Sequence, residues 1–291
     1  MKRRNQALLL LIPTFAFTAT FIYGPFLLAF YNAFFSWEEG EYRIFVGLGN
    51  FRHLLFEDYL FWHSMKIMAI LSVTYIAKVM IVPMLAAVLI SRVGNARLRG
   101  AYRNLIVIAL IVPSVAVYMI WRQIYHPDGE LGLANRLFAL FGLEPIAWFR
   151  DPDTALLTII LTGFPWASGV PMLIYLAGLQ NISQDVKEAA TIDGVGPLQR
   201  FFRMELPLIV GQVRLIAILS VISSVQDFVG VYLLTRGGPA GTTYVPGLLM
   251  FDYAIKYNQI GMGCALGVIL FLIVLTLTLF IHRFVRTEDY L

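Results

Sequence analysis

The sequence predicts an all-α integral membrane protein with about six transmembrane helices and a cytoplasmic helix between the fourth and the fifth. Three observations lead to this prediction. The 291 residues are 59% hydrophobic and 14% charged, with a mean hydropathy of +0.74, whereas soluble domains are about 45–50% apolar and about 25% charged. Several apolar windows are long enough to cross a bilayer, and the basic residues between them are unevenly distributed.

Six apolar windows are interpreted as spans because about 20 residues cross about 30 Å of hydrocarbon. They lie near residues 7–35, 67–90, 104–121, 154–179, 207–234 and 260–282. The first window continues well past the apolar core of a signal peptide, and no convincing cleavage site follows it. It is therefore interpreted as a retained span.

The basic residues set the expected orientation. Twelve lysines and arginines lie in the N-terminus, residues 91–103, residues 180–205 and the tail, against eight in the three opposite loops. Because cytoplasmic loops carry the excess, both termini are expected in the cytoplasm. The expected division is a first helix with its extracytoplasmic loop (1–66), a five-helix core (67–283) that contains the loop 181–207, and a cytoplasmic tail (284–291).

The loop between spans four and five predicts a short helix with its own ends. Ser183 can cap its start, Asp185 lies in the first turn where the helix dipole favours a carboxylate, and Gly194 can take the positive φ of a C-terminus. Ala189 and Ala190 predict a low-profile surface on this helix.

A second short helix is predicted to start at Pro197. Leu198, Phe201 and Phe202 form an apolar face suited to the headgroup region. The two helices are expected to lie at an angle, with Glu188 exposed on the first, and to form a protrusion that fits a groove in another protein.

The residues of this loop resemble a known family. Glu188-Ala189-Ala190, three residues, Gly194, nine residues and Met204-Glu205-Leu206-Pro207 have the spacing of the EAA loop of ABC-importer permeases. Met204 replaces the usual isoleucine, which is a volume-preserving change.

The resemblance extends beyond this loop. Further residues are similar to the sugar class of these permeases, of the maltose, lactose and glycerol-phosphate type. They are Asp193, Gln199, Phe201, Pro113, Trp166, the Leu-Ala-Gly-Leu run at 176–179, the Thr-Arg-Gly-Gly-Pro run at 235–239 and the two threonines at 242–243.

The resemblance implies a permease subunit of a binding-protein-dependent importer of a sugar, oligosaccharide or related polyol, in a bacterial or archaeal cytoplasmic (inner) membrane. Its expected partners are a second permease, which is expected to be a different chain, two ATP-binding subunits, an extracytoplasmic solute-binding protein and membrane lipid. ATP and Mg²⁺ would bind to the ATPase subunits, and this chain itself would bind no cofactor. The ATPase-coupling residues would be Glu188, Ala189, Ala190, Asp193, Gly194, Leu206 and Pro207.

Ionisable groups inside spans suggest a solute path, because their solvation there is expensive. Asp227, beside Gln226, can bind sugar hydroxyls, or it can pair with Lys78 or with the partner permease as a structural ion pair. Trp166 lies where glycines and prolines interrupt span four, and such breaks are used where a cavity is lined, although packing is the alternative role. Gly263 and Gly267 form a GxxxG pattern that predicts close helix packing.

Other function classes fit less well. A self-contained carrier or channel would use Lys78 and Asp227 as an ion relay, but the two halves of the chain show no convincing repeat. An enzyme has no support, since the chain lacks a GxxxxGK[ST] loop, an HExxH pair and a GxSxG elbow. The single Cys264 excludes an intrachain disulfide, and a net charge of +4 is too small and dispersed for nucleic-acid binding.

Overall fold

The structure, a computed structural model, describes residues 2–38 and 42–284. The predicted tail from residue 285 onward lies outside this part. The chain is about 75% helical, which confirms the predicted all-α class. Contacts divide it into two compact units, one made of Met1–Met65 with Pro246–Ile273 and the other of Lys66–Val245 with Val274–Leu291.

The first unit contains the N-terminal helices, a small hairpin and a helical segment from the C-terminal third. Its elements are α1 (Lys2–Thr18), η1 (Ala19–Tyr23), α2 (Gly24–Asn32), β1 (Phe35–Ser36), β2 (Ile44–Phe45), α3 (Gly49–Arg52), η2 (His53–Glu57), α15 (Pro246–Phe251), η5 (Asp252–Lys256), the start of α4 (Tyr59–Ser91) and most of α16 (Ile260–Phe284).

Side-chain hydrogen bonds hold the turns of this unit. The Asn50 amide donates to the carbonyls of Ala33 and Phe35, at 2.9 Å each, across the antiparallel hairpin. The Tyr253 hydroxyl donates to the Asp58 carboxylate at 2.7 Å. Burial, and then this hydrogen bond, raise the pKa of Tyr253, so the hydroxyl remains a donor at neutral pH.

The GxxxG pattern of α16 serves close packing inside the first unit. A Cβ on Gly263 would lie 2.9 Å from the Cβ of Ala254 and 3.3 Å from the carbonyl oxygen of Met250, and one on Gly267 would lie 3.4 Å from the Met250 sulfur. The two glycines therefore let α16 lie directly against α15 and η5, as the pattern predicts.

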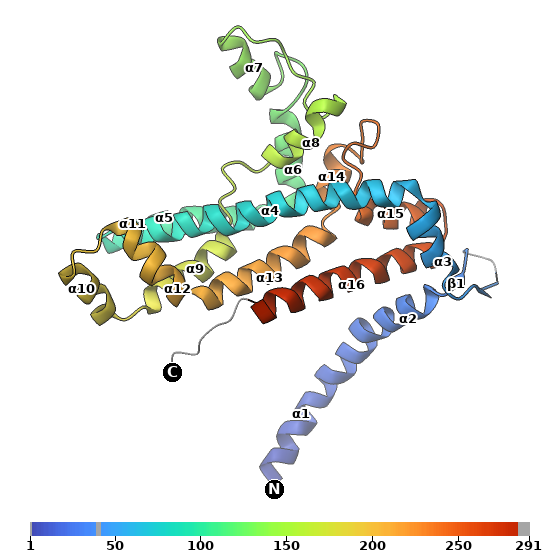
Figure 1. The fold of residues 1–291 in the computed structure, drawn as a ribbon, viewed down its shortest axis with the longest axis horizontal. Helices are drawn as coiled ribbons and strands as arrows, with labels where there is room; N and C mark the ends of the chain where they lie inside the picture. Colours follow the sequence, from blue (N-terminus) through green and yellow to red (C-terminus); the bar gives the residue numbers. More distant parts are fainter. Residues whose placement is uncertain (1, 39–41, 285–291) are drawn as a thin grey trace. The chain divides into compact units, whose positions relative to one another are not determined.

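The second unit contains the remaining helices (Figure 1). They are the rest of α4, α5 (Ala96–Ile108), η3 (Ala109–Ile111), α6 (Ser114–Ile124), α7 (Leu133–Leu140), α8 (Pro152–Leu161), α9 (Gly169–Asn181), α10 (Gln184–Ile192), α11 (Pro197–Arg200), η4 (Phe201–Glu205), α12 (Leu206–Leu208), α13 (Val210–Gln226) and α14 (Val229–Leu234).

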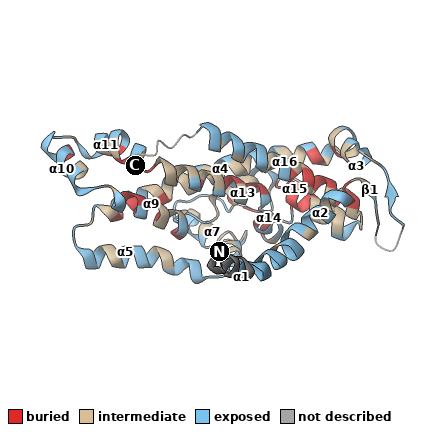
Figure 2. Cartoon of the chain, turned by 90° about the horizontal axis from the view of Figure 1, so that it is seen from below, coloured by how far each residue is buried: buried red, intermediate tan, exposed pale blue. Residues whose placement is uncertain are grey.

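The core of the second unit lies around α9. This helix packs against α5 and α13, and α14 packs against α6. Figure 2 shows the buried positions gathered on α9 and α13, whereas α5 is largely exposed. One hydrophobic cluster joins the last turns of α4 to α9 and α13, and its buried members are Ala87, Val88, Ile90, Met172, Tyr175, Leu176, Leu179, Phe201, Ile209 and Ile216.

Three described helices are long and apolar enough to cross a membrane, or up to five if each bent pair counts as one span. The three are Leu10–Asn32, Tyr59–Ser91 and Ile260–Phe284. The bent pairs are Ala96–Ile111 with Ser114–Ile124, at 95°, and Pro197–Leu208 with Val210–Gln226, at 73°.

Helix breaks interrupt the predicted third, fourth and fifth spans. The window 104–121 was interpreted as one span, but its helix breaks at Pro113, which lacks the N–H that continues a helix. The window 154–179 contains the break that its glycines and prolines predict, between Leu161 and Gly169. The window 207–234 was also interpreted as one span, but its helix ends at Gln226 and a new one starts at Val229.

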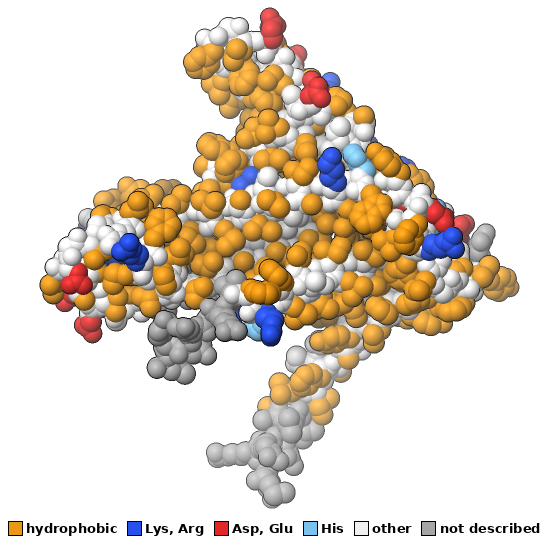
Figure 3. All heavy atoms as spheres, viewed as in Figure 1, with side chains coloured by type: hydrophobic (Ala, Val, Ile, Leu, Met, Phe, Trp, Pro, Cys, Tyr) orange, Lys and Arg blue, Asp and Glu red, His pale blue; other side chains and the backbone are white. Residues whose placement is uncertain are grey.

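Large apolar side chains cover much of the outer surface. Figure 3 shows hydrophobic side chains over most of the visible face, with few charges among them. Leu105 and Ile111, for example, are 67% and 78% exposed. A water-facing surface rarely carries so much contiguous apolar area, so this surface suits lipid and partner subunits.

Residues 125–150, between α6 and α8, fold around one buried amide. Asn135 on α7 is 1% exposed. Its amide nitrogen donates to the carbonyls of Pro127, at 2.9 Å, and Ile146, at 3.0 Å, and its oxygen accepts from the Trp148 indole at 2.8 Å. A single side chain thus fixes a segment that has little regular structure besides α7.

Candidate functional site

The segment from Ser183 to Val195 forms the short helix predicted from the sequence, α10. The Ser183 hydroxyl accepts the N–H of Val186 at 3.4 Å, and Asp185 lies in the first turn. At the other end Gly194 adopts φ +66°, its N–H donates to Thr191 and the N–H of Val195 donates to Ala190. This pair of bonds is a Schellman motif, which satisfies carbonyls that a helix end leaves open.

α10 presents a ridge that nothing in the described chain covers. In Figures 1 and 2 it lies beyond the ends of α9 and α13. Glu188, Ala189, Asp193 and Gly194 are exposed, and the apolar Ile192 is 85% exposed. The outer side of α10 therefore leaves charged, small and apolar side chains accessible to another protein.

The predicted small-residue surface is only half correct. Ala189 faces outward, but Ala190 is 1% exposed and packs inside the loop. Helix geometry explains the difference, because successive residues point about 100° apart, so that Ala190 can be turned toward the loop while Ala189 is not.

The second helix of the loop also departs from its prediction. Leu198 and Phe202 are 72% and 57% exposed, as expected for a headgroup-facing side, but Phe201 is 8% exposed and belongs to the core cluster. Leu206 packs against the same cluster, while Pro207 is exposed at the 73° bend before α13. Two of the three residues of the predicted apolar face are therefore exposed, whereas the third, Phe201, packs into the protein core.

A buried carboxylate that sequence reasoning missed joins this loop to α4. Glu205 is 8% exposed. Its Oε1 lies 2.9 Å from Nε of Arg200, and its Oε2 lies 3.5 Å from a terminal guanidinium nitrogen of Arg92. That guanidinium also donates to the carbonyl of Pro197 at 3.1 Å. Because Arg92 is far from the loop in sequence, no local pattern could have revealed the pair.

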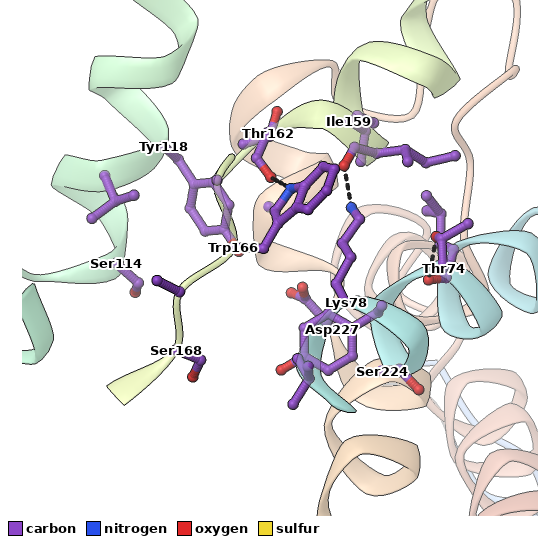
Figure 4. A pocket seen from close by; sticks show the side chains of 18 of the residues that line it. Thr74, Lys78, Ser114, Tyr118, Ile159, Thr162, Trp166, Ser168, Ser224 and Asp227 are labelled. Atoms are coloured by element: carbon purple, nitrogen blue, oxygen red, sulfur yellow. Dashed lines mark hydrogen bonds between the residues drawn. The ribbon is translucent and has the colours of Figure 1, made fainter. Parts of the chain in front are cut away.

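A cavity of about 470 Å³ lies in the second unit (Figure 4). This volume is within the range of about 300–1,000 Å³ usual for small-molecule sites. Its polar lining residues are Thr74, Tyr75, Lys78, Ser114, Tyr118, Thr162, Trp166, Ser168, Ser224 and Asp227. Each of the three helix breaks contributes to it, through Ser114, through residues 162–169 and through Asp227. Broken helices are used where backbone lines a cavity.

Trp166 lies in the break between α8 and α9. It adopts φ +57°, which is uncommon for a bulky residue. Its indole nitrogen donates to the carbonyl of Thr162 at 3.2 Å, and its ring lies under the Lys78 ammonium, 5.0 Å from the ring centroid. Trp166 therefore lines the cavity, as expected, and also packs within the break.

Lys78 does not pair with Asp227, although such a pair was one of the expected alternatives. Its ammonium donates to the carbonyl of Ile160 and stacks on Trp166. Within the described residues no ion pair joins Lys78 to a carboxylate. The reason is local, because the last carbonyls of α8 have no helical partners and an ammonium is favoured there.

Asp227 and Gln226 have different surroundings. The Asp227 carboxylate accepts backbone N–H groups from Val229 and Gly230, at the start of α14, and it lines the cavity. Both side chains are exposed, but Gln226 is not part of the lining. Of the three predicted solute-path residues, the cavity brings together Asp227 and Trp166. No cluster of His, Cys, Asp or Glu among residues 2–38 and 42–284 could hold a metal.

Known proteins are similar to this chain in sequence and in fold. The profile of the family described as "Binding-protein-dependent transport system inner membrane component" matches residues 80–287. The probable ABC transporter permease YesP of Bacillus subtilis is 31% identical over 282 residues, covering 92% of this chain and 89% of YesP. The trehalose/maltose permease MalF of Thermococcus litoralis is 32% identical over 237 residues, covering 81% and 78%.

A solved structure shows the same fold. The crystal structure of a bacterial ABC transporter involved in alginate import superposes with a TM-score of 0.85 at 21% identity, covering 99% of this chain and 97% of that chain.

The chain belongs to the family of inner membrane components of binding-protein-dependent transport systems. It is a membrane permease subunit of an ABC importer, and separate subunits of such systems hydrolyse ATP. The comparisons give no support to a self-contained carrier.

Proposed function

We propose that this chain is one of two permease subunits of an importer for a sugar, an oligosaccharide or a related polyol. The names of its relatives support this cargo, since one transports trehalose and maltose. The cavity supports it as well, because hydroxyl groups, an indole and a carboxylate line one wall. Aromatic faces and hydrogen-bonding groups together suit a hydroxylated ligand.

The remaining partners complete this proposal. The second permease is a different chain, two ATP-binding subunits bind ATP and Mg²⁺ on the cytoplasmic face, and an extracytoplasmic protein delivers the solute. Each permease offers one short docking helix, which fits one ATPase subunit per permease. Both termini lie in the cytoplasm of a bacterial or archaeal cell, because the basic residues are concentrated on that side.

The observation that best supports this proposal is the structure of α10, which is a helix with its own caps and an uncovered outer face. In this proposal Glu188, Ala189 and Asp193 contact the ATPase, and Ala190 anchors α10 within the loop. Gly194 ends the helix, and Leu206 and Pro207 join the loop to α13. ATP-driven closure of the ATPase pair moves α10 and so alternates the access of the cavity.

Within the cavity, Asp227 and Trp166 lie on the solute path in this proposal. Asp227 binds hydroxyl groups through its free carboxylate lone pairs, and the Trp166 ring offers an apolar face. Gln226 is exposed at the end of α13 and does not line this cavity.

The proposal is tested with variants of α10. Glu188→Lys reverses an exposed charge on the docking ridge, and Gly194→Val places a branched residue at φ +66°, where left-handed backbone costs about 1–2 kcal/mol. Both variants are expected to abolish uptake of whichever labelled sugar, among maltose, trehalose and glycerol-3-phosphate, the unmodified complex imports. The ATPase should no longer co-purify with the tagged chain, and membrane insertion should be unchanged.

Matched controls separate docking from general damage. Gly142→Val introduces the same strain, at φ +70° with nothing within 4 Å, and Glu144→Lys reverses an exposed charge in the segment between α6 and α8. Both controls should transport normally. Wild-type uptake and ATPase recovery in both α10 variants would disprove the coupling assignment.

A further inference from the structure

The ionic cluster of Arg92, Arg200 and Glu205 connects two parts of the second unit that the chain separates widely. Arg92 directly follows the last turn of α4, and its backbone N–H donates to the carbonyls of Val88, at 3.3 Å, and Leu89, at 3.2 Å. Glu205 lies at the end of η4, next to the bend that leads into α13. The cluster therefore bridges the end of α4 and the base of the α10 loop.

The two arginines hold Glu205 in different ways. Arg200 belongs to the same loop and forms the shorter contact, 2.9 Å to Oε1. Arg92 reaches Oε2 at 3.5 Å, and that oxygen has no hydrogen bond. With Arg200 in place, the buried carboxylate keeps a compensating charge even if Arg92 moves away, so Arg92 can be removed without leaving an isolated buried charge.

Arg92 makes a second contact with the loop, besides its ion pair with Glu205. Its guanidinium donates to the carbonyl of Pro197, the first residue of α11, at 3.1 Å. Apolar contacts lie beside this bond, because Val88 and Ile90 from the end of α4 share the core cluster with Phe201. A displacement of the loop therefore acts on the end of α4 through one side chain and the adjoining apolar contact.

α4 carries such a displacement to the cavity. The helix is unbroken from Tyr59 to Ser91, through Pro83. Leu71, Thr74 and Lys78 on this helix line the cavity. At 1.5 Å per residue, Lys78 lies about 20 Å from Arg92 along the axis.

We propose that Arg92 is a positioning residue that transmits the movement of the α10 loop to α4. When the loop is displaced, the hydrogen bond from Arg92 to Pro197 and the ion pair of Arg92 with Glu205 draw the end of α4 with the loop. The wall of the cavity that carries Leu71 and Lys78 then shifts. This inference rests on the proposed function, because it takes α10 as the helix that the ATPase moves.

The test follows the cavity wall and does not need the cargo. The complex with its second permease and ATPase subunits is purified into nanodiscs from a Cys264→Ser, Leu71→Cys background. The labelling rate of the new cysteine by a trimethylammonium-ethyl methanethiosulfonate is compared between ADP and ATP with vanadate. With Arg92 present the two rates should differ, and Arg92→Gln should reduce the ratio by at least about fivefold, the low end of measured couplings.

Control variants show how Arg92 acts. Arg97→Gln removes an exposed arginine from the neighbouring α5 and should keep the full ratio, and Arg92→Lys should restore part of it. In a Glu205→Gln background the hydrogen bond from Arg92 to the Pro197 carbonyl remains, so Arg92→Gln should still reduce the ratio, but by less than in the unmodified protein. ATP hydrolysis and ATPase recovery should remain within about twofold in the Arg92→Gln complex, since coupling and docking are separate quantities.

Three results would overturn the inference: an unchanged ratio in Arg92→Gln, a loss of ATPase recovery in that variant, or equal labelling rates when Arg92 is present. Failure of the proposed function is recognised separately, because the ATPase would then co-purify normally with Glu188→Lys.

Discussion

At the scale of single residues, Asp227 and Gln226 show how strongly position decides a role. They are adjacent polar residues in one predicted span. The helix ends between them, so that the Asp227 carboxylate caps the start of α14 and lines the cavity, whereas Gln226 does not line it. A polar side chain that lines the cavity can therefore be separated experimentally from one that only lies beside it.

Asp227→Asn is expected to lower solute uptake about tenfold, because a hydrogen bond to a charged group contributes about 1.5–3 kcal/mol and the amide keeps the shape without the charge. Uptake in proteoliposomes measures the effect. Gln226→Asn is the matched control and should leave uptake unchanged. ATPase recovery should be normal in both variants, and normal uptake in Asp227→Asn would assign that carboxylate to helix capping alone.

At the scale of elements, small residues decide how closely helices pack. Gly263 and Gly267 let α16 approach α15 and η5 within the first unit. In α5, by contrast, a Cβ added to Gly100 would meet nothing within 4 Å. The same residue type is thus essential for packing in one helix and dispensable in another.

Gly263→Val is expected to destabilise the chain by about 1–3 kcal/mol, because the new side chain would overlap Ala254 and the backbone at Met250. Thermal unfolding of the detergent-purified protein measures this change. Gly100→Val should leave the transition temperature almost unchanged. Equal transitions for the two variants would show that α15 and η5 move away at little cost.

At the scale of the whole molecule, the orientation in the membrane is a prediction from charge rather than from packing. The distribution of basic residues predicts that the loop with α10 lies on the cytoplasmic side and the segment with α7 on the opposite side. Each side offers an exposed reporter position, Ile192 at 85% and Leu140 at 78% exposure.

Single-cysteine variants in a Cys264→Ser background test this orientation. Leu140→Cys should react with an impermeant maleimide in intact spheroplasts, because α7 is expected outside. Ile192→Cys should react only after the membrane is permeabilised. Labelling read by gel shift distinguishes the two, and the reverse pattern would place the termini outside and refute the charge-based topology.

The fold class and the ends of α10 could be predicted because they depend on short-range patterns. Apolar windows report membrane spans, and Ser183 and Gly194 act on backbone groups within a few residues. The family resemblance also came from a local spacing. Local patterns did not reveal the break of the window 104–121 at Pro113 or the break of the window 207–234 after Gln226.

The long-range contacts of the site could not be predicted. Lys78 and Ile160 are 82 residues apart, and Arg92 and Pro197 are 105 apart, so only the folded chain brings each pair together. Periodicity also could not tell that Phe201 faces protein while Phe202 stays exposed, because both are equally apolar. Polar partners and the identity of a buried face are properties of tertiary packing.

The self-contained ends of α10 bear on how such importers diversify. Because Ser183 and Gly194 close the helix without help from the cavity-lining elements, substitutions at Glu188, Ala189 and Ile192 alter the outer ridge and leave the cavity lining unchanged. The surface that selects the ATPase and the residues that select the solute can then evolve independently. One ATPase shared among several permeases, or one permease adapted to a new ATPase, requires changes on only a few helical turns.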